Sequence, residues 1–390
     1  MAGDLVTGQY YSFVYGRQVQ PDEIPSFCFH GVKARYFEDV LGYMKENNYI
    51  NITAEEYYRI RQGKMEKPGN AIMVSFDDGT GSIWSVAYPL LEKYGFRATV
   101  FLIPGRISAS TKSLPNLKDV WASEATLEEI DARDESSRPF LTWEEVRRVH
   151  ETGVIDFQSH GMEHRQVFIG PDIVDFVRPE NIRKYTFFQF SMFDELDLKN
   201  PDKTVLEPGS PVYQSAPRLS DNPRYHDDDR LKKACIDFVR NEGGAVFFEG
   251  KDWRTRLEAV VSQYRSSHLP EERIESLEEQ RQAMLLEMHE SKEQIEKNLP
   301  GKVVRHFCYP WGVSGRISQR LLNETGYVTA YTGRIRRNIR LTLKQNPNEL
   351  YRIGPDFFYL LPGKGRDTLF GVLKRKVTKR ARRGTHHLSY

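Results

Sequence analysis

The sequence AIMVSFDDG occupies residues 71–79 and joins an apolar run to two adjacent carboxylates. Residues 71–76 have the length and the apolar content of a buried strand. Asp77 and Asp78 follow this strand directly, and Gly79 comes next. Asp-Asp-Gly is ordinary turn chemistry, so this stretch taken alone favours a polar turn. The same pair of carboxylates could also divide two tasks, one binding a metal and the other acting as a base.

Similar apolar runs recur along the chain and alternate with helix-like stretches. Residues 36–47 have apolar side chains at helical spacing, and residues 83–94 predict another helix that ends at Gly95. Thr53 and Thr142 look like helix N-caps, because acidic residues follow each of them in the first turn. Strands that alternate with helices indicate βα units and a parallel sheet. The other predicted strands are residues 26–30, 98–103, 154–158, 303–308 and 327–331.

A second motif, SHGMEH, occupies residues 159–164 directly after a predicted strand. His160 and His164 are four residues apart, so on a helical turn both would lie on one face and could share a cation. Imidazoles with one carboxylate suit Zn²⁺ or a similar divalent ion and leave positions open for water and substrate. An exposed helix start that carries two histidines is the alternative interpretation.

Two further features follow strands. FCYPWG at residues 307–312 ends a strand in a turn whose backbone N–H groups could face a developing oxyanion. His30 ends the first predicted strand, although a single histidine there is more often structural. All four features lie at the C-terminal ends of predicted strands, where α/β barrels collect their active sites. Together they provide the groups needed for metal-assisted hydrolysis.

These motifs resemble those of the polysaccharide deacetylases, the NodB-homology group also called carbohydrate esterase family four. The family's (S/T)FDDG matches residues 75–79, its (S/T)H-x-x-x-H matches residues 159–164, and one form of its third motif, F-x-Y-P-x-G, matches residues 307–312. Members with that third form have a permuted order in which the catalytic histidine precedes the Asp-Asp motif, and His30 fits that place. The resemblance implies an α/β fold, a distorted (β/α) barrel of about seven strands, with a large insertion.

The resemblance also implies a metal centre. Asp78, His160 and His164 would hold a divalent metal, with Zn expected first and Co, Ni or Mn as alternatives. Asp77 would be the general base that takes a proton from the attacking water, whose pKa the metal lowers. The products would be acetate and a free amino sugar.

The remaining roles complete the implied mechanism. His30 would be the general acid that protonates the leaving amine. The backbone N–H of Trp311, with Tyr309 beside it, would hold the oxyanion and contact the substrate. The sequence departs from the family's other form of the third motif, which begins with an arginine that orients the base, because Cys308 stands there.

The expected function is hydrolysis of an N-acetyl group from an amino sugar in a polysaccharide, oligosaccharide or lipid-linked glycan precursor. One alternative is a deformylase or amidase of the same fold that acts on another amide. The other is a non-catalytic glycan-binding relative, against which the intact Asp77, Asp78, His160 and His164 argue.

Composition limits the classes of protein that fit. The chain has 390 residues and a net charge of +2, which argues against nucleic acid as a partner. No apolar run is long enough to span a bilayer, and the first residues lack the pattern of a secretory signal. Three cysteines are too few for a disulfide scaffold. These features together predict a cytoplasmic protein.

Charge is unevenly distributed, and this suggests the domain plan. Residues 364–390 contain nine Lys/Arg and one acid, whereas the rest of the chain is mildly acidic. This tail could be a basic amphipathic helix on an anionic inner membrane face, an unstructured extension or, less favoured, a nucleic-acid binder. We expect an N-terminal extension (1–24), a deacetylase barrel (25–363) with an insertion (166–268) that shapes substrate choice, and the tail (364–390).

Overall fold

The structure is a computed structural model that describes residues 10–136, 139–182, 184–185, 206–269, 271, 273–333 and 341–382. The chain divides into two compact units. The first consists of Met1–Met162, Met288–Val313 and Leu322–Tyr390, and the second of Glu163–Glu287 and Ser314–Leu321. The boundaries predicted from sequence for the extension, insertion and tail stay predictions.

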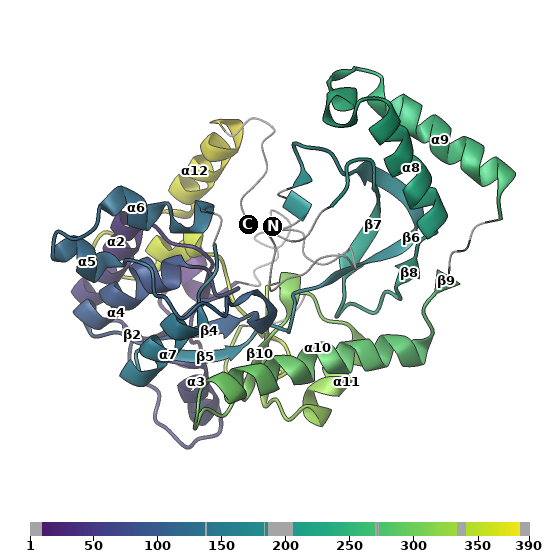
Figure 1. The fold of residues 1–390 in the computed structure, drawn as a ribbon. Helices are drawn as coiled ribbons and strands as arrows, with labels where there is room; N and C mark the ends of the chain where they lie inside the picture. Colours follow the sequence, from purple (N-terminus) through teal and green to yellow (C-terminus); the bar gives the residue numbers. More distant parts are fainter. Residues whose placement is uncertain are drawn as a thin grey trace. The chain divides into compact units, whose positions relative to one another are not determined.

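The first unit is built on a sheet of parallel strands, as the alternating pattern predicts (Figure 1). Each strand pairs in parallel with its neighbours, and a short strand, β2 (Ile50–Asn51), pairs with β3 outside the main path. In their order across the sheet the strands are β1 (Ser26–Phe29), β3 (Ala71–Phe76), β4 (Ala98–Leu102), β5 (Ile155–Ser159), β10 (His306–Cys308), β11 (Thr329–Thr332) and β12 (Leu350–Tyr351).

The two ends of this sheet meet, so the seven strands form a nearly closed barrel. The N–H of Cys28 donates to the carbonyl of Ile353 at 2.9 Å, and the N–H of Ile353 donates to the carbonyl of Ser26 at 2.8 Å. These bonds connect β1 to the residue two positions after β12 and remove both edges of the sheet. The predicted α/β barrel of about seven strands is therefore confirmed.

Helices connect the strands of the barrel, and their N-termini confirm two predicted caps. The Thr53 and Thr142 side chains accept N–H bonds from Glu56 and Glu145, and each glutamate bonds back to complete a capping box. These helices are α2 (Ala34–Glu46), α3 (Ala54–Arg61), α4 (Tyr88–Tyr94), α7 (Trp143–Thr152), α10 (Leu277–Asn298) and α11 (Arg316–Glu324).

The structure differs from the predicted helix over 83–94 in one respect. Ile83–Ala87 form a π-helical turn, and α4 begins only at Tyr88. Pro89 has no N–H to donate to the preceding turn, so the regular ladder cannot run through this point. Residues 105–139, which have the composition of a polar loop, also contain two short helices, α5 (Leu117–Trp121) and α6 (Leu127–Asp131).

The second unit has its own sheets and core. β6 (Gln166–Phe176) pairs with β7 (Pro211–Pro217), and β8 (Tyr225–His226) pairs with β9 (Arg273–Ile274), both antiparallel. α8 (Asp229–Asn241) is capped by Asp228 and packs with α9 (Trp253–Ser267) around Phe176 and Cys235. The apolar run 245–248 lies in a short 3-10 helix.

The basic tail begins with a helix, α12 (Leu369–Arg382). Its side chains are described as far as Arg375: Val372 is buried, whereas Phe370 is 78% exposed. Over the residues that the structure describes, no helix has the length and the apolar composition to cross a bilayer. The last eight residues lie outside the described part of the chain.

Candidate metal centre and active site

The site residues leave the barrel strands at their C-terminal ends. β1 and β3 pair in register with Phe29 opposite Phe76, so His30 and Asp77 leave neighbouring strands side by side. The N–H of Asp77 donates to the carbonyl of Phe29 at 2.9 Å, which extends this pairing by one residue. His160 follows β5 and Arg352 follows β12 at the same edge of the sheet.

Backbone conformation is unusual at three of the predicted site residues. In the described part of the chain, five non-glycine residues have positive φ, and Asp78 (71°), His164 (58°) and Trp311 (60°) are among them. A non-glycine residue in this region costs free energy, and such residues concentrate at active sites and ligand sites. The strain therefore supports a functional role for these positions.

His160 is held in an orientation that suits a metal ligand. Its Nδ1 lies 2.8 Å from the carbonyl oxygen of Cys308, and its backbone N–H donates to Leu102 at 2.7 Å. With Nδ1 donating to this carbonyl, Nε2 faces Asp78, lies 3.4 Å from its Oδ1, and is the nitrogen that would bind a metal. Histidine ligands in metal sites commonly use a backbone carbonyl in this way to fix the tautomer.

The donor set fits a divalent metal ion. One donor atom each from Asp78, His160 and His164 lies within 4.8 Å of the other two, and all three residues are buried. One carboxylate and two imidazoles form a three-ligand set of the kind found at catalytic metal sites, which keep positions open for water and substrate. These residues are the three that the sequence predicts as ligands.

Asp77 is bound by an arginine from the other end of the chain. Nη1 of Arg352 donates to Oδ1 of Asp77 at 2.7 Å, and Nη2 donates to Oδ2 at 2.6 Å. Nη1 also donates to Oγ of Ser75 at 2.8 Å. Burial alone would raise the pKa of Asp77, but the charge of Arg352, the nearby His160 and these hydrogen bonds hold it well below its usual range. Asp77 is therefore ionised near neutral pH.

Arg352 is itself buried inside the barrel. Only 4% of the residue is exposed, and its guanidinium lies 5.0 Å from the centre of the Phe101 ring and 5.7 Å from that of Tyr331. Such cation–π contacts help to accommodate a charge away from water. Arg352 follows β12, and none of the sequence motifs predicts its bond to Asp77.

Two cysteines lie against the same carboxylate. The Cys28 thiol donates to Oδ2 of Asp77 at 3.1 Å, and the Cys308 thiol approaches the same oxygen at 3.6 Å. Burial raises the pKa of both thiols, so both are protonated near neutral pH. Asp77 therefore accepts hydrogen bonds from thiols and from a guanidinium at once.

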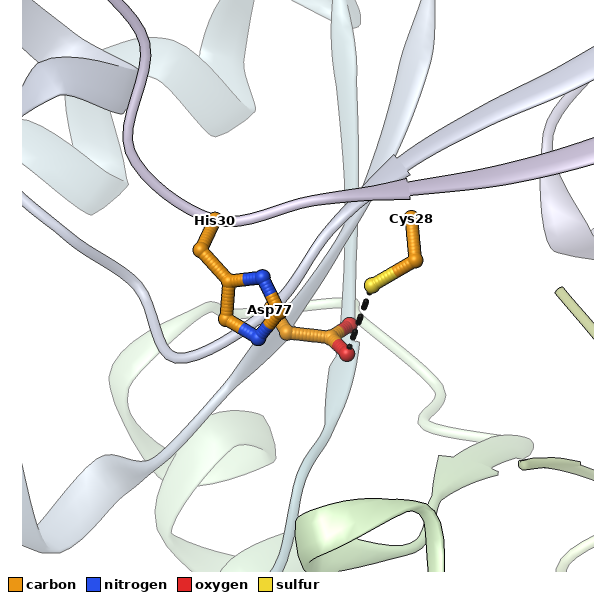
Figure 2. A group of neighbouring side chains, drawn as sticks. All are labelled: Cys28, His30 and Asp77. Carbon is orange, nitrogen blue, oxygen red and sulfur yellow. Dashed lines mark hydrogen bonds between the residues drawn. The ribbon is translucent and has the colours of Figure 1, made fainter. Parts of the chain in front are cut away.

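His30 lies next to Asp77 and Cys28. A ring nitrogen of His30 is within 4.8 Å of both the Asp77 carboxylate and the Cys28 sulfur. Figure 2 shows the imidazole beside Asp77, with Cys28 pointing toward the carboxylate from the neighbouring stretch of β1. His30 and Cys28 are both half-buried, whereas Asp77 is buried. The position suits a group that exchanges a proton with substrate.

The turn after β10 forms the remaining part of the predicted site. Pro310–Gly312 is a short 3-10 turn in which Trp311 has its left-handed conformation, and the carbonyl of Gly312 accepts a bond from Oγ1 of Thr332 at 2.7 Å. Tyr309 is buried, and its ring packs edge-on against Phe307. The oxyanion role of Trp311 and the substrate contact of Tyr309 stay predictions.

Comparison with known proteins agrees with this geometry. Residues 64–186 match the family described as polysaccharide deacetylase. The matched segment includes Asp77, Asp78, His160 and His164. The chain is also 24% identical over 132 residues to the poly-β-1,6-N-acetyl-D-glucosamine N-deacetylase of Staphylococcus aureus (strain MSSA476), an alignment that covers 34% of this chain and 37% of that protein.

Solved structures agree on the fold. A de-N-acetylase from Aggregatibacter actinomycetemcomitans is similar with a TM-score of 0.50 and 14% identity, covering 91% of this chain and 99% of that chain. The BpsB deacetylase domain from Bordetella bronchiseptica is similar with a TM-score of 0.50 and 15% identity, covering 86% and 98%. The alignments with the first curated relatives span only about a third of their length, 33% and 37%.

Two neighbours of Asp77, Cys28 and Arg352, lie outside the three sequence motifs and were not predicted from them. Cys28 stands two residues before His30, and alternate residues of a strand point to the same face, so this spacing could have indicated it. Arg352 is 275 residues from Asp77 and belongs to no motif. The one sequence feature that could have indicated Arg352 is its position as a charged residue directly after an apolar strand.

Proposed function

We propose that this protein hydrolyses an N-acetyl group of an amino sugar in a polysaccharide, oligosaccharide or lipid-linked glycan precursor and releases acetate. The observation that carries the proposal is an ionised carboxylate, Asp77, fixed by Arg352 beside the Asp78–His160 pair at the C-terminal edge of the barrel. The family of residues 64–186 supports the same chemistry. The relative from Staphylococcus aureus, by its name, acts on an N-acetylated glucosamine polymer.

The proposed cofactor is a divalent ion, Zn first and Co, Ni or Mn as alternatives, held by Asp78, His160 and His164. When bound, such an ion polarises a carbonyl oxygen and makes a water molecule more acidic. The carbonyl of Cys308 keeps His160 in the tautomer that presents Nε2 to the ion.

The residues of the chain then divide the proton transfers. Asp77 takes a proton from the water that attacks the acetamide carbon, and Arg352 keeps the carboxylate in one orientation. The C–N bond breaks as His30 gives a proton to the leaving nitrogen. The N–H of Trp311 donates to the oxygen that becomes negative during the attack. Water and amide are thereby converted to acetate and amine.

The permuted arrangement, with the acid before the base in the sequence, is part of the proposal. Its support is that His30 leaves the strand next to Asp77 and has a ring nitrogen within 4.8 Å of its carboxylate. A proton donor this close to a proton acceptor supports consecutive proton transfers to one substrate.

Released acetate provides the direct test. Metal-reconstituted protein should release acetate from N-acetylglucosamine oligomers, with β-1,6-linked substrates tried first. Asp78→Asn should lose most of its bound metal, measured by atomic emission, because it removes a charged ligand. Glu144→Gln, which changes an acid on the surface of α7, should retain the metal. If Asp78→Asn keeps full metal content, the proposed ligand set is wrong.

The same assay separates the alternative activities. Formylated amino sugars are offered in parallel, and release of formate without acetate would identify a deformylase or amidase of the same fold. Binding of glycan without release of either acid, by protein that contains its metal, would identify a glycan-binding relative. Either result would replace N-deacetylation as the function.

We also propose that the tail holds the protein on an anionic lipid surface, such as the inner face of a membrane. Phe370 and Leu373 are exposed on α12 at 78% and 37%, and the exposed Lys374 and Arg375 follow them. Apolar and basic side chains together on one helix suit the interface of an anionic bilayer.

A truncation that ends at Leu373 removes seven Lys/Arg and keeps the buried Val372. Each basic residue near an anionic surface contributes about 1 kcal/mol, so binding to phosphatidylserine vesicles should fall more than about a hundredfold. Vesicle sedimentation measures this loss, and phosphatidylcholine vesicles serve as the control. Equal binding by the full-length and truncated proteins would exclude the membrane role of the tail.

A further inference from the structure

A second group of potential metal ligands lies beside the first. The Cys28 sulfur, a ring nitrogen of His30 and a carboxylate oxygen of Asp77 all lie within 4.8 Å of one another (Figure 2). This group shares no residue with Asp78, His160 and His164. It differs from them in chemistry as well, because it contains sulfur.

The three donors suit a soft or borderline cation. Thiolate and imidazole select Zn²⁺ and its heavier congener Cd²⁺ over the hard ions that oxygen ligands prefer. The Cys308 sulfur, 3.6 Å from Oδ2 of Asp77, is a candidate for the fourth position. One thiolate and one carboxylate carry two negative charges, one of which the guanidinium of Arg352 already offsets.

We propose that Cys28, His30 and Asp77 form a second, inhibitory site for a soft divalent cation. An ion there occupies the carboxylate oxygen and the imidazole nitrogen that the reaction needs for proton transfer. Binding at this site is independent of the proposed function, whereas the loss of activity rests on it.

The surroundings set the order in which the two sites fill. To bind, Cys28 must release its proton to solvent, and the guanidinium of Arg352 already donates to both oxygens of Asp77. Both effects oppose a cation at the second site. The first site therefore fills first, and the second fills only when the ion is in excess.

A cation can reach the second site more easily than the remaining cysteine of the chain. Cys28 and His30 are half-buried at the edge of the barrel, whereas Cys235 is fully buried between helices of the second unit. Cys235→Ser is therefore a matched control, because it removes a thiol that belongs to neither proposed metal site.

Cadmium provides a readout that does not depend on activity. Coordination of Cd²⁺ by a thiolate gives an ultraviolet charge-transfer band, and Asp78, His160 and His164 contribute no sulfur, so the band reports a cysteine ligand. Because Cys308 also lies in a group of potential ligands with Asp77 and His160, the Cys28 variants decide whether the band belongs to the second site. We expect the band to appear after the first equivalent of Cd²⁺ and to be lost in Cys28→Ser and Cys28→Ala. Cys235→Ser should keep it, and Cys308→Ser should weaken it if Cys308 is the fourth ligand.

Two results would overturn the site: a wild-type protein that gives no band with excess Cd²⁺, or a band that persists in both Cys28 variants. Excess Zn²⁺ is then added to the active enzyme, and the concentration that halves the rate should rise at least tenfold in Cys28→Ser relative to Cys235→Ser. A normal cadmium band in a protein that releases no acetate would instead reject the proposed function and leave the site in place.

Discussion

Replacing Asp77 by Asn should reduce acetate release by about 10²–10⁴-fold, the usual contribution of a general base. The amide has nearly the same shape, but it cannot take up a proton from water. The metal content should stay at the wild-type level, because the proposed ligands are Asp78, His160 and His164. Steady-state rates on an acetylated oligomer and atomic emission of the purified variant are the two measurements.

The same variant should also be less stable. The neutral amide would leave the guanidinium of Arg352 buried without its anion, and breaking one side of a buried ion pair costs about 3–5 kcal/mol. Denaturant unfolding measures this loss. The double variant Asp77→Asn/Arg352→Met removes the buried charge and should recover part of the stability with no recovery of rate. An Asp77→Asn protein with wild-type activity would refute the proposed mechanism.

Replacing Arg352 by Gln should alter both the rate and its dependence on pH. Arg352 does not react itself, so it is a positioning residue, and displacement of a catalytic group by about 1 Å can reduce the rate about 10²-fold. Without its guanidinium, burial becomes the dominant influence and raises the pKa of Asp77. The acidic limb of the kcat profile should therefore move to higher pH, a shift that a purely structural role would not produce.

The pH dependence of stability gives an independent check on this pair. In the wild type the pKa of Asp77 is lower in the folded than in the unfolded protein, so its stabilising contribution is present above the unfolded value of about 3.9 and is lost as the pH falls below it. In Arg352→Gln the folded pKa is raised, so protonation on acidification stabilises the fold. The gap in unfolding free energy between the two proteins should narrow at low pH.

Two further variants complete the test of Arg352. Arg352→Lys keeps a charge but not the paired geometry, so it should recover some stability and little rate. Arg148→Gln removes an exposed arginine that pairs with Glu144 on the surface, where ion pairs contribute little, and should change neither quantity. A pH profile that is the same in wild type and Arg352→Gln would show that Arg352 does not act through Asp77.

Cys308 illustrates how the chain accommodates its departure from the family's arginine-led motif. At the position where that form carries the arginine, Cys308 has a small side chain, and Nη2 of Arg352 contacts its sulfur while bonding to Asp77. Because the Cys308 side chain is small, the guanidinium of Arg352, the residue after β12, has room to reach the Asp77 carboxylate. Asp77 therefore has an arginine partner, which follows β12 and not β10.

The sequence by itself determined the features that depend on short spacing. The βα alternation predicted the parallel barrel, Thr53 and Thr142 marked helix starts, and residues 75–79 and 159–164 identified the Asp and His candidates. Period and spacing within a few residues decide which side chains share a face, so a local pattern contains this information. The π-helical turn at Ile83–Ala87 was missed, because it reflects how a proline fits into an otherwise regular helix.

Only the tertiary structure decided what surrounds Asp77. Closure of the barrel by hydrogen bonds between β1 and Ile353 brings the first and last strands together. That closure places Arg352 on a carboxylate 275 residues away and adds the sulfur of Cys28 to the same oxygen. No periodicity in the chain encodes a contact between residues so far apart. The contact depends on the number of strands that the barrel needs before it can close. The proposed acid, base and ligands come from the motifs and the resemblance they carry, whereas the charge state and orientation of Asp77 depend on the closed barrel.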